Sequence, residues 1–242
     1  MNNLEKLFIG AIIIAFVFFT KIMVDLANSK KDYFEPQSQS IIDNNNKQFP
    51  ALYINLEHRE DRKNQIEGEL KKVDFYNYQR FNAVKNKKGY LGCSQSHIDC
   101  IKLAKANNFP NVMILEDDFQ FLIGKNEFHM ILNHLLTVEY DVFILGYNTR
   151  DITDIGDKYL KKIRGTQTTS GYIVNRRYYD KLITNFEEGL RLLKETDIYS
   201  KYAIDQYWKL IQPDDKWLVY KRIGKQRESF SDIENVNVNY NI

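Results

Sequence analysis

The chain has 242 residues, with 34 Lys and Arg against 32 Asp and Glu and a formal net charge of +2 at pH 7. This balance gives no reason to expect a nucleic-acid partner, which would favour a strongly basic surface. Two cysteines are too few for a zinc site built from cysteine alone, which needs about four. Cys93 and Cys100 are seven positions apart on a predicted helix. That spacing is about 10 Å of rise, beyond the roughly 7 Å between Cα atoms that a disulfide allows, so both are expected to be unpaired.

An apolar segment opens the chain. Residues 7–24 carry one charge, Lys21, whose long side chain can reach the membrane surface. A span of this length is close to the minimum for a transmembrane helix. We therefore expect a single-pass membrane anchor over residues 1–27, with a cleaved signal peptide as the alternative because Ala27 is small. The flanking lysines are too few to fix the side of the membrane on which the rest of the chain lies.

The segment 28–49 is polar, rich in Asn, Gln and Ser, and contains one Pro. Such a composition buries little apolar surface, so a flexible stem is expected there. The remaining residues, 50–242, are numerous enough for one globular domain with a sizeable core.

Strand-like and helix-like patterns alternate along this domain. Apolar runs predict strands at 51–56, 79–84, 112–115, 141–145, 168–174 and 217–220. Helical patterns cover 60–72, 94–106 with Ser94 as the N-cap, 127–136, 178–186 and 203–211. From residue 223 onward the chain is polar and an irregular tail is expected. The alternation predicts an α/β fold with a mostly parallel central sheet covered on both faces.

Three consecutive carboxylates, Glu116, Asp117 and Asp118, follow the predicted strand 112–115. Ligands of α/β proteins bind at the carboxyl ends of strands. Adjacent carboxylates raise one another's pKa unless a cation compensates, and oxygen ligands suit hard divalent ions. The cluster therefore predicts a metal site that neutralises the phosphates of a nucleotide-type substrate. The alternative is a solvated acidic turn.

Two further groups of polar residues lie close to predicted strand ends. Arg59 and Arg62 are three positions apart at a helix start, so both can face the end of the first strand, where guanidinium groups suit phosphate. Gly92 lets backbone approach a ligand closely, and Ser96 and His97 can contact a nucleotide or brace the acidic loop. The alternatives are local ion pairing for the arginines and a structural hydrogen bond for the histidine.

The order of these motifs resembles glycosyltransferase family 25, which includes lipopolysaccharide-core transferases and procollagen galactosyltransferases. The matching motifs run from the first predicted strand to the tail and comprise Leu52-Tyr53-Ile54-Asn55-Leu56, Arg59, Arg62, Arg80-Phe81-Asn82-Ala83-Val84, Gly92-Cys93, Ser96-His97, Ile114-Leu115-Glu116-Asp117-Asp118, Thr169-Ser170-Gly171-Tyr172, Asp205-Gln206, Gln226 and Ser229-Phe230-Ser231-Asp232-Ile233. The chain is much shorter than the two-domain collagen enzymes, so the acceptor class does not transfer from them.

The resemblance implies a GT-A-like domain that transfers a sugar, galactose or glucose, from a UDP-sugar to an acceptor hydroxyl with inversion and with Mn²⁺ or Mg²⁺. The acceptor is a glycan, a lipid-linked glycan or a protein hydroxyl. By the same similarity Asp118 and Glu116 are the metal candidates, and Asp205, Glu116 and Asp117 are the catalytic candidates, with Asp205 as general base. The candidates for donor binding are Asn55, Arg59, Arg62, Asn82, Ala83, Gly92, Ser96, His97, Gln226 and Ser229.

Two other classes of function compete with this interpretation. A non-catalytic, membrane-tethered binding module on a degenerate transferase fold is the first. A metal-dependent phosphoesterase or nuclease is the second, and it would need further His and Asp ligands for two metals. The four histidines form no such cluster in the sequence.

Overall fold

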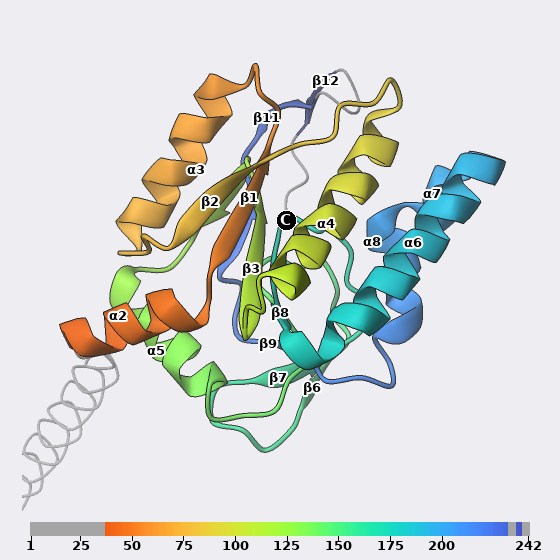
Figure 1. Cartoon of the computed structure of the whole chain (residues 1–242). Helices are drawn as coiled ribbons and strands as arrows, with labels where there is room; N and C mark the ends of the chain where they lie inside the picture. The colour runs from red at the N-terminus through yellow and green to blue at the C-terminus, as the bar shows by residue number, and fades with distance from the viewer. Residues whose placement is uncertain (1–36, 232–235, 239–242) are drawn as a thin grey trace, which may run out of the picture. The chain divides into compact units, whose positions relative to one another are not determined.

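The computed structural model describes residues 37–231 and 236–238 (Figure 1). The predicted anchor at 1–27 and the first part of the predicted stem, 28–36, lie outside the described residues. Within the described part of the chain, no helix combines the length and the apolar character that a membrane span requires. The described residues form one compact unit.

An eight-stranded sheet is the centre of this unit, with the strand order β2-β1-β3-β8-β5-β9-β7-β6. Six of the eight strands run in the same direction, and β8 and β7 run opposite to them. The predicted α/β class with a mostly parallel sheet is therefore confirmed. The strands are β1 Ala51–Asn55, β2 Tyr78–Asn82, β3 Asn111–Glu116, β5 Val142–Ile144, β6 Ile152–Asp154, β7 Lys161–Ile163, β8 Gly171–Asn175 and β9 Trp217–Val219.

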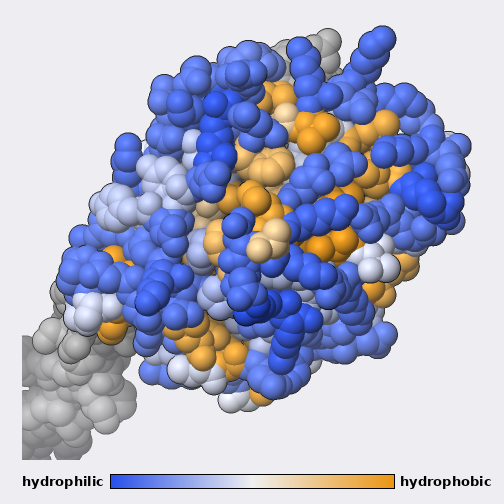
Figure 2. Space-filling model, viewed as in Figure 1, coloured by the Kyte–Doolittle hydropathy of each residue, from blue (hydrophilic) through white to orange (hydrophobic). Residues whose placement is uncertain are grey.

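Helices cover both faces of the sheet, because successive strand side chains point to opposite sides. Tyr53 and Met113 lie in a core with α3 (Glu60–Lys72) and α5 (Lys125–Leu135). Leu52 and Ile114 lie in a second core with α4 (Gly89–Ala106) and α6 (Tyr179–Thr196). Figure 1 shows α3 on one side of the sheet and α4 and α6 on the other. In the same view, Figure 2 shows a mostly hydrophilic surface, with hydrophobic residues gathered between the helices.

The prediction of a flexible stem is wrong for residues 39–48, which are helical. Gln39–Gln48 form helix α2, in which Ile42 and Asn45 are buried. The Asn45 side-chain amide donates to the carbonyl oxygen of His129 at 2.9 Å, which joins α2 to α5. The polar composition suggested disorder, but here the amide side chains make hydrogen bonds inside the fold.

Most other predicted elements match the structure within a few residues, with four differences. The helix predicted over 178–186 is α6, which continues for ten more residues, to Thr196. Helix α4 begins at Gly89 rather than at Ser94, whose hydroxyl donates to the carbonyl oxygen of Tyr90 one turn earlier. The predicted helix 203–211 is α8 (Ile204–Tyr207) followed by a 3-10 turn, η2 (Trp208–Ile211). The predicted irregular tail contains strands β10 Gly224–Gln226, β11 Ser229–Ser231 and β12 Val236–Val238, and elsewhere the sequence missed β4 Phe119–Phe121, β6, β7, η1 Arg176–Tyr178 and α7 Tyr199–Tyr202.

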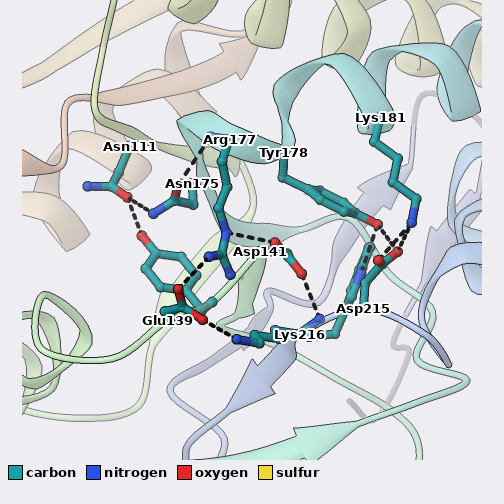
Figure 3. A network of polar contacts seen from close by, with 11 residues as sticks. Asn111, Glu139, Asp141, Asn175, Arg177, Tyr178, Lys181, Asp215 and Lys216 are labelled. Atoms are coloured by element: carbon teal, nitrogen blue, oxygen red, sulfur yellow. Dashed lines mark hydrogen bonds and ion pairs between the residues drawn. The ribbon is translucent and has the colours of Figure 1, made fainter.

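A polar network closes the edge of the sheet where β5 and β9 begin and β8 ends (Figure 3). Arg177 Nε donates to Asp141 Oδ1 at 3.0 Å, and the Lys216 amide donates to Asp141 Oδ2 at 2.7 Å. The Tyr178 hydroxyl donates to Asp215 at 2.6 Å. These hydrogen bonds join the segments before β5 and β9 to the segment after β8 and stabilise this end of the sheet. The carboxyl ends of β1 and β3 lie at the opposite end of the sheet.

Candidate functional site

The acidic motif lies at the carboxyl edge of the sheet. Strand β3 ends at Glu116, parallel to β1, which ends at Asn55. Strand β8 runs antiparallel to β3 and begins at Gly171 opposite Leu115, so the residues before it enter at the same edge. After the acidic motif, β4 pairs with β10, which carries Gln226 to a place opposite Phe119. Residues distant in sequence therefore meet around Glu116.

Asp117 holds the loop that carries the cluster. Its Oδ2 accepts a hydrogen bond from Asn55 Nδ2 at 2.8 Å, and its Oδ1 accepts one from Arg62 Nη1 at 2.9 Å. Burial raises the pKa of Asp117, although the Arg62 charge and both hydrogen bonds oppose the rise. Asp117, in the turn after β3, thus connects the end of β1 and the start of α3 to the acidic loop.

Glu116 is surrounded by donors. It accepts from the Thr169 hydroxyl at 2.8 Å and from Gln226 Nε2 at 3.5 Å, and its Oε1 lies 3.2 Å from His97 Nε2. Burial alone would raise the pKa of Glu116, but the His97 contact and the Thr169 bond bring it below its ordinary value. Because an ionised carboxylate only accepts, His97 Nε2 is the donor to Glu116, and His97 Nδ1 lies 2.9 Å from the Tyr172 hydroxyl.

Asp118 lacks this compensation. Among the described residues, its Oδ1 is buried without a hydrogen-bond partner. Its Oδ2 lies 3.6 Å from Arg62 Nη1, which already serves Asp117. Burial, and then the neighbouring Glu116 carboxylate, raise the pKa of Asp118 to about 8. An unsatisfied buried carboxylate oxygen beside a second carboxylate is an environment that a hard cation would relieve, so these residues fit a divalent ion.

A second set of metal-ligating types also includes Glu116. In the described part of the chain, ligand atoms of Cys93, His97 and Glu116 lie within 4.8 Å of one another. Cys93 and His97 are one turn apart on α4, and burial, with the nearby Glu116 charge, raises the pKa of the Cys93 thiol. Both cysteines are unpaired, as predicted. Since a protonated thiol is a poor ligand, this set suits a hard cation less well than the pair of Glu116 and Asp118.

Two cavities adjoin the cluster. The first has a volume of about 350 Å³ and the second of about 250 Å³. Cys93, Glu116 and Gln226 line both cavities, so these residues form the boundary between them. The first is also lined by Ile54, Leu56, His58, Arg62, Ala83, Val84, Lys85, Asn86, Gly89, Gly92, Ser96, His97, Asp117 and Asp118. The second is also lined by Tyr90, Asn148, Gln167, Thr168, Thr169, Tyr199, Ala203, Ile204, Asp205 and Gln206.

Most of the predicted site residues line these cavities, and four do not. Asn55 lies behind Asp117 as its partner, and Asn82 is exposed at the end of β2. Ser229 begins β11. Arg59 is the residue before α3, lines neither cavity, and pairs through its guanidinium with Asp61 at 2.9 Å. Gln226, in the tail that was expected to be irregular, lies in strand β10.

Gly92 and Ser96 shape the wall of the first cavity. A Cβ on Gly92 would lie 2.2 Å from the carbonyl oxygen of Val84, so the close approach of α4 to the chain after β2 needs glycine. One turn later the Ser96 hydroxyl donates to the Gly92 carbonyl at 2.7 Å and accepts from the Val84 amide at 2.8 Å. The two residues hold the segment that carries Lys85 and Asn86 into the cavity.

Asp205 lies in the second cavity, at the first turn of α8. Its Oδ2 accepts from the Thr168 amide at 3.3 Å, and its Oδ1 from Gln206 Nε2 at 3.4 Å. Burial, and to a smaller extent the Glu116 charge, raise its pKa above the ordinary value. A carboxyl with a raised pKa that lines a cavity is a candidate proton acceptor.

Thr168, Thr169 and Cys93 contribute to the site without having been assigned a role from sequence. Thr169 was quoted in the motif, but its contact with Glu116 follows from the antiparallel pairing of β8 with β3, which no local pattern reveals. The Thr168 hydroxyl donates to Gln226 Oε1 at 3.1 Å, a contact between two segments that are distant in sequence.

The sequence matches no family model and no curated protein. Three solved structures resemble the fold weakly. A197 from STIV has a TM-score of 0.43 and 9% identity over 79% of this chain and 94% of that chain. A glycosyltransferase involved in glycosylation of the major capsid of PBCV-1 has a TM-score of 0.45 and 10% identity over 71% and 81%. Mannose-1-phosphate geranyltransferase from Thermus thermophilus has a TM-score of 0.43 and 12% identity over 74% and 75%. At these scores and identities the likenesses carry no argument about activity, and the resemblance to family 25 stays a prediction.

Proposed function

We propose that the chain is a glycosyltransferase that moves a hexose from a UDP-sugar to an acceptor hydroxyl. One observation carries the proposal: two cavities meet at Glu116, and each contains a carboxyl suited to a different part of this reaction. The first contains Asp118, whose buried oxygen suits a cation. The second contains Asp205, whose raised pKa suits proton transfer. A donor in the first cavity and an acceptor in the second would react at their boundary.

In this proposal the first cavity binds the donor. Arg62 and Lys85 line it and supply positive charge for a diphosphate. Asp118, with Glu116, would hold Mn²⁺ or Mg²⁺, which when bound supplies charge that stabilises a departing diphosphate. Apolar Ile54 and Leu56 at the end of β1 offer a surface for a base or ribose.

Asp205 would act as the general base. The acceptor oxygen forms a bond to the anomeric carbon of the donor while the bond from that carbon to the diphosphate oxygen breaks. Attack in line with the departing diphosphate inverts the anomeric carbon, and the hydroxyl proton passes to the Asp205 carboxylate. The hydrogen bond from the Thr168 side chain to the Gln226 side chain joins two segments that line the second cavity. The choice of galactose or glucose, the family and the membrane anchor rest on sequence alone.

UDP release by the full-length chain in detergent tests the proposal directly. The assay uses a panel of UDP-hexoses with Mn²⁺, with Mg²⁺ and with EDTA. We expect release with one hexose and one of the metals, and loss of release in EDTA and in Asp118→Asn. Binding of a UDP-sugar without release or transfer to any acceptor would instead identify a non-catalytic binding module and would refute the proposal.

A further inference from the structure

The second cavity differs in charge from the first. Arg62 and Lys85 line the first cavity beside the carboxyls of Glu116, Asp117 and Asp118, whereas the described residues lining the second include the carboxyls of Glu116 and Asp205 and no cation. The rest of its polar lining is neutral and consists of amides and hydroxyls, from Asn148, Gln167, Thr168, Thr169, Gln206 and Gln226. A pocket with two carboxyls and no lining cation disfavours an anionic group and suits a ligand rich in hydroxyls.

Two tyrosines at the same cavity provide an aromatic surface. The Tyr90 and Tyr199 rings have centroids 5.4 Å apart at 62°, and Tyr199 is 47% exposed. The Tyr90 hydroxyl donates to Asp197, which also pairs with Lys88 at 2.7 Å, so the Tyr90 ring is held in place. The Tyr199 ring, which is exposed at the cavity and packs against the fixed Tyr90 ring, can stack on the C–H groups of a sugar.

The size of the cavity limits what it encloses. Its volume of about 250 Å³ lies below the roughly 300–1,000 Å³ of pockets that enclose drug-sized ligands. It therefore has room for one sugar ring rather than for a folded peptide segment or a long oligosaccharide, whose further units would extend past Tyr199 into solvent.

We propose that the second cavity binds one uncharged sugar residue of the acceptor, with a face of the ring on Tyr199 and its hydroxyls on the surrounding amides and threonines. One hydroxyl then lies toward Asp205. This inference rests on the proposed function and narrows it: the acceptor is a neutral glycan, and a phosphorylated sugar, a uronic acid or the diphosphate of a lipid carrier does not enter this cavity.

Matched pairs of acceptors test the charge requirement. The full-length chain with its UDP-hexose donor is given methyl glycosides of glucose, galactose and mannose, each beside the corresponding methyl uronide, which differs by a carboxylate. Binding is measured independently of turnover by saturation-transfer NMR. At least one neutral glycoside is expected to bind and accept sugar, with its uronide weaker by about 10-fold or more. Equal binding of a uronide, or binding of none of the neutral glycosides, would overturn the inference.

Variants of Tyr199 test the stacking. Tyr199→Ala is expected to raise the acceptor KM by about 2- to 10-fold more than it raises the donor KM, and Tyr199→Phe, which keeps the ring, restores the acceptor KM. Tyr76→Ala is the matched control, because Tyr76 is 62% exposed and follows α3, outside both cavities. An acceptor KM that moves no more in Tyr199→Ala than in Tyr76→Ala would contradict the inference. Hydrolysis of the donor without an acceptor separates the two proposals. If the donor is hydrolysed but no neutral glycoside accepts sugar, the inference about the second cavity is refuted and the proposed transferase function is not.

Discussion

Replacing Asp118 by asparagine should stabilise the metal-free protein while it removes metal-dependent activity. Burial and the Glu116 charge raise the pKa of Asp118 from 3.8 to about 8. At pH 7 the pH is about three units above the pKa of this carboxyl in the unfolded chain, so the carboxyl is ionised there. Folding without a cation must therefore return a proton to it. At about 1.4 kcal/mol for each unit, this costs about 4 kcal/mol of folding free energy, which a neutral amide of the same shape avoids.

The sign follows from the raised pKa. The folded state holds the proton more tightly than the unfolded state, so Asp118 lowers stability progressively as pH rises from about 4 to about 8. At pH 5 the difference between wild type and Asp118→Asn should fall to about 2 kcal/mol, because the pH is then only about one unit above the pKa of this carboxyl in the unfolded chain.

Thermal unfolding in EDTA at pH 7 and pH 5 measures the effect. Each kcal/mol corresponds to about 2–4 °C in Tm for a domain of this size, so Asp118→Asn should melt higher at pH 7 and by a smaller margin at pH 5. Asp117→Asn is the matched control: burial raises the pKa of Asp117 as well, but this substitution removes an ion pair with Arg62 and a hydrogen bond from Asn55, so the variant should melt lower. An Asp118→Asn protein that melts below wild type in EDTA would refute the reasoning.

Three further predictions concern the wall of the first cavity, helix α2 and the proposed general base. Gly92→Ala places a Cβ 2.2 Å from the Val84 carbonyl and should lower stability by about 1–3 kcal/mol in urea titrations; an unchanged midpoint would show that the wall can move. Asn45→Ala leaves the buried end of α2 without its bond to His129 and should cost about 1–3 kcal/mol, with faster amide exchange in α2; unchanged exchange would mean that α2 is held by other contacts. Asp205→Asn should lower kcat by about 10²- to 10⁴-fold with little change in donor KM, and normal transfer by this variant would remove Asp205 from the role of base.

The sequence predicted elements well where one pattern dominates locally. Helix α3 was placed at its observed bounds, Glu60–Lys72, and the buried strand before Glu116 was found because its run of apolar residues is uninterrupted. The position of the acidic cluster at a strand end was likewise predicted from residue type and place, whereas Gly92 was predicted to let backbone approach a ligand and is found against the Val84 carbonyl.

The sequence predicted poorly where contacts between distant segments decide the outcome. The meeting of Thr169 and Gln226 at Glu116 depends on two antiparallel pairings, β8 with β3 and β10 with β4. Helix α2 was taken for a stem because its amide-rich residues satisfy hydrogen bonds that exist only in the folded chain. Arg59 was taken for a site residue because helical spacing was applied to a residue that precedes the helix.

Calorimetric titration of UDP into the full-length protein tests the central claim, that the carboxylates at the end of β3 bind a divalent cation that receives a nucleotide diphosphate. The titration is run with Mn²⁺ and with EDTA, on wild type and on Asp118→Asn. We predict that UDP binds wild type with Mn²⁺, and that both EDTA and the substitution abolish or greatly weaken the binding. UDP binding that is equally tight with and without a divalent ion, or in wild type and the variant, would contradict the account.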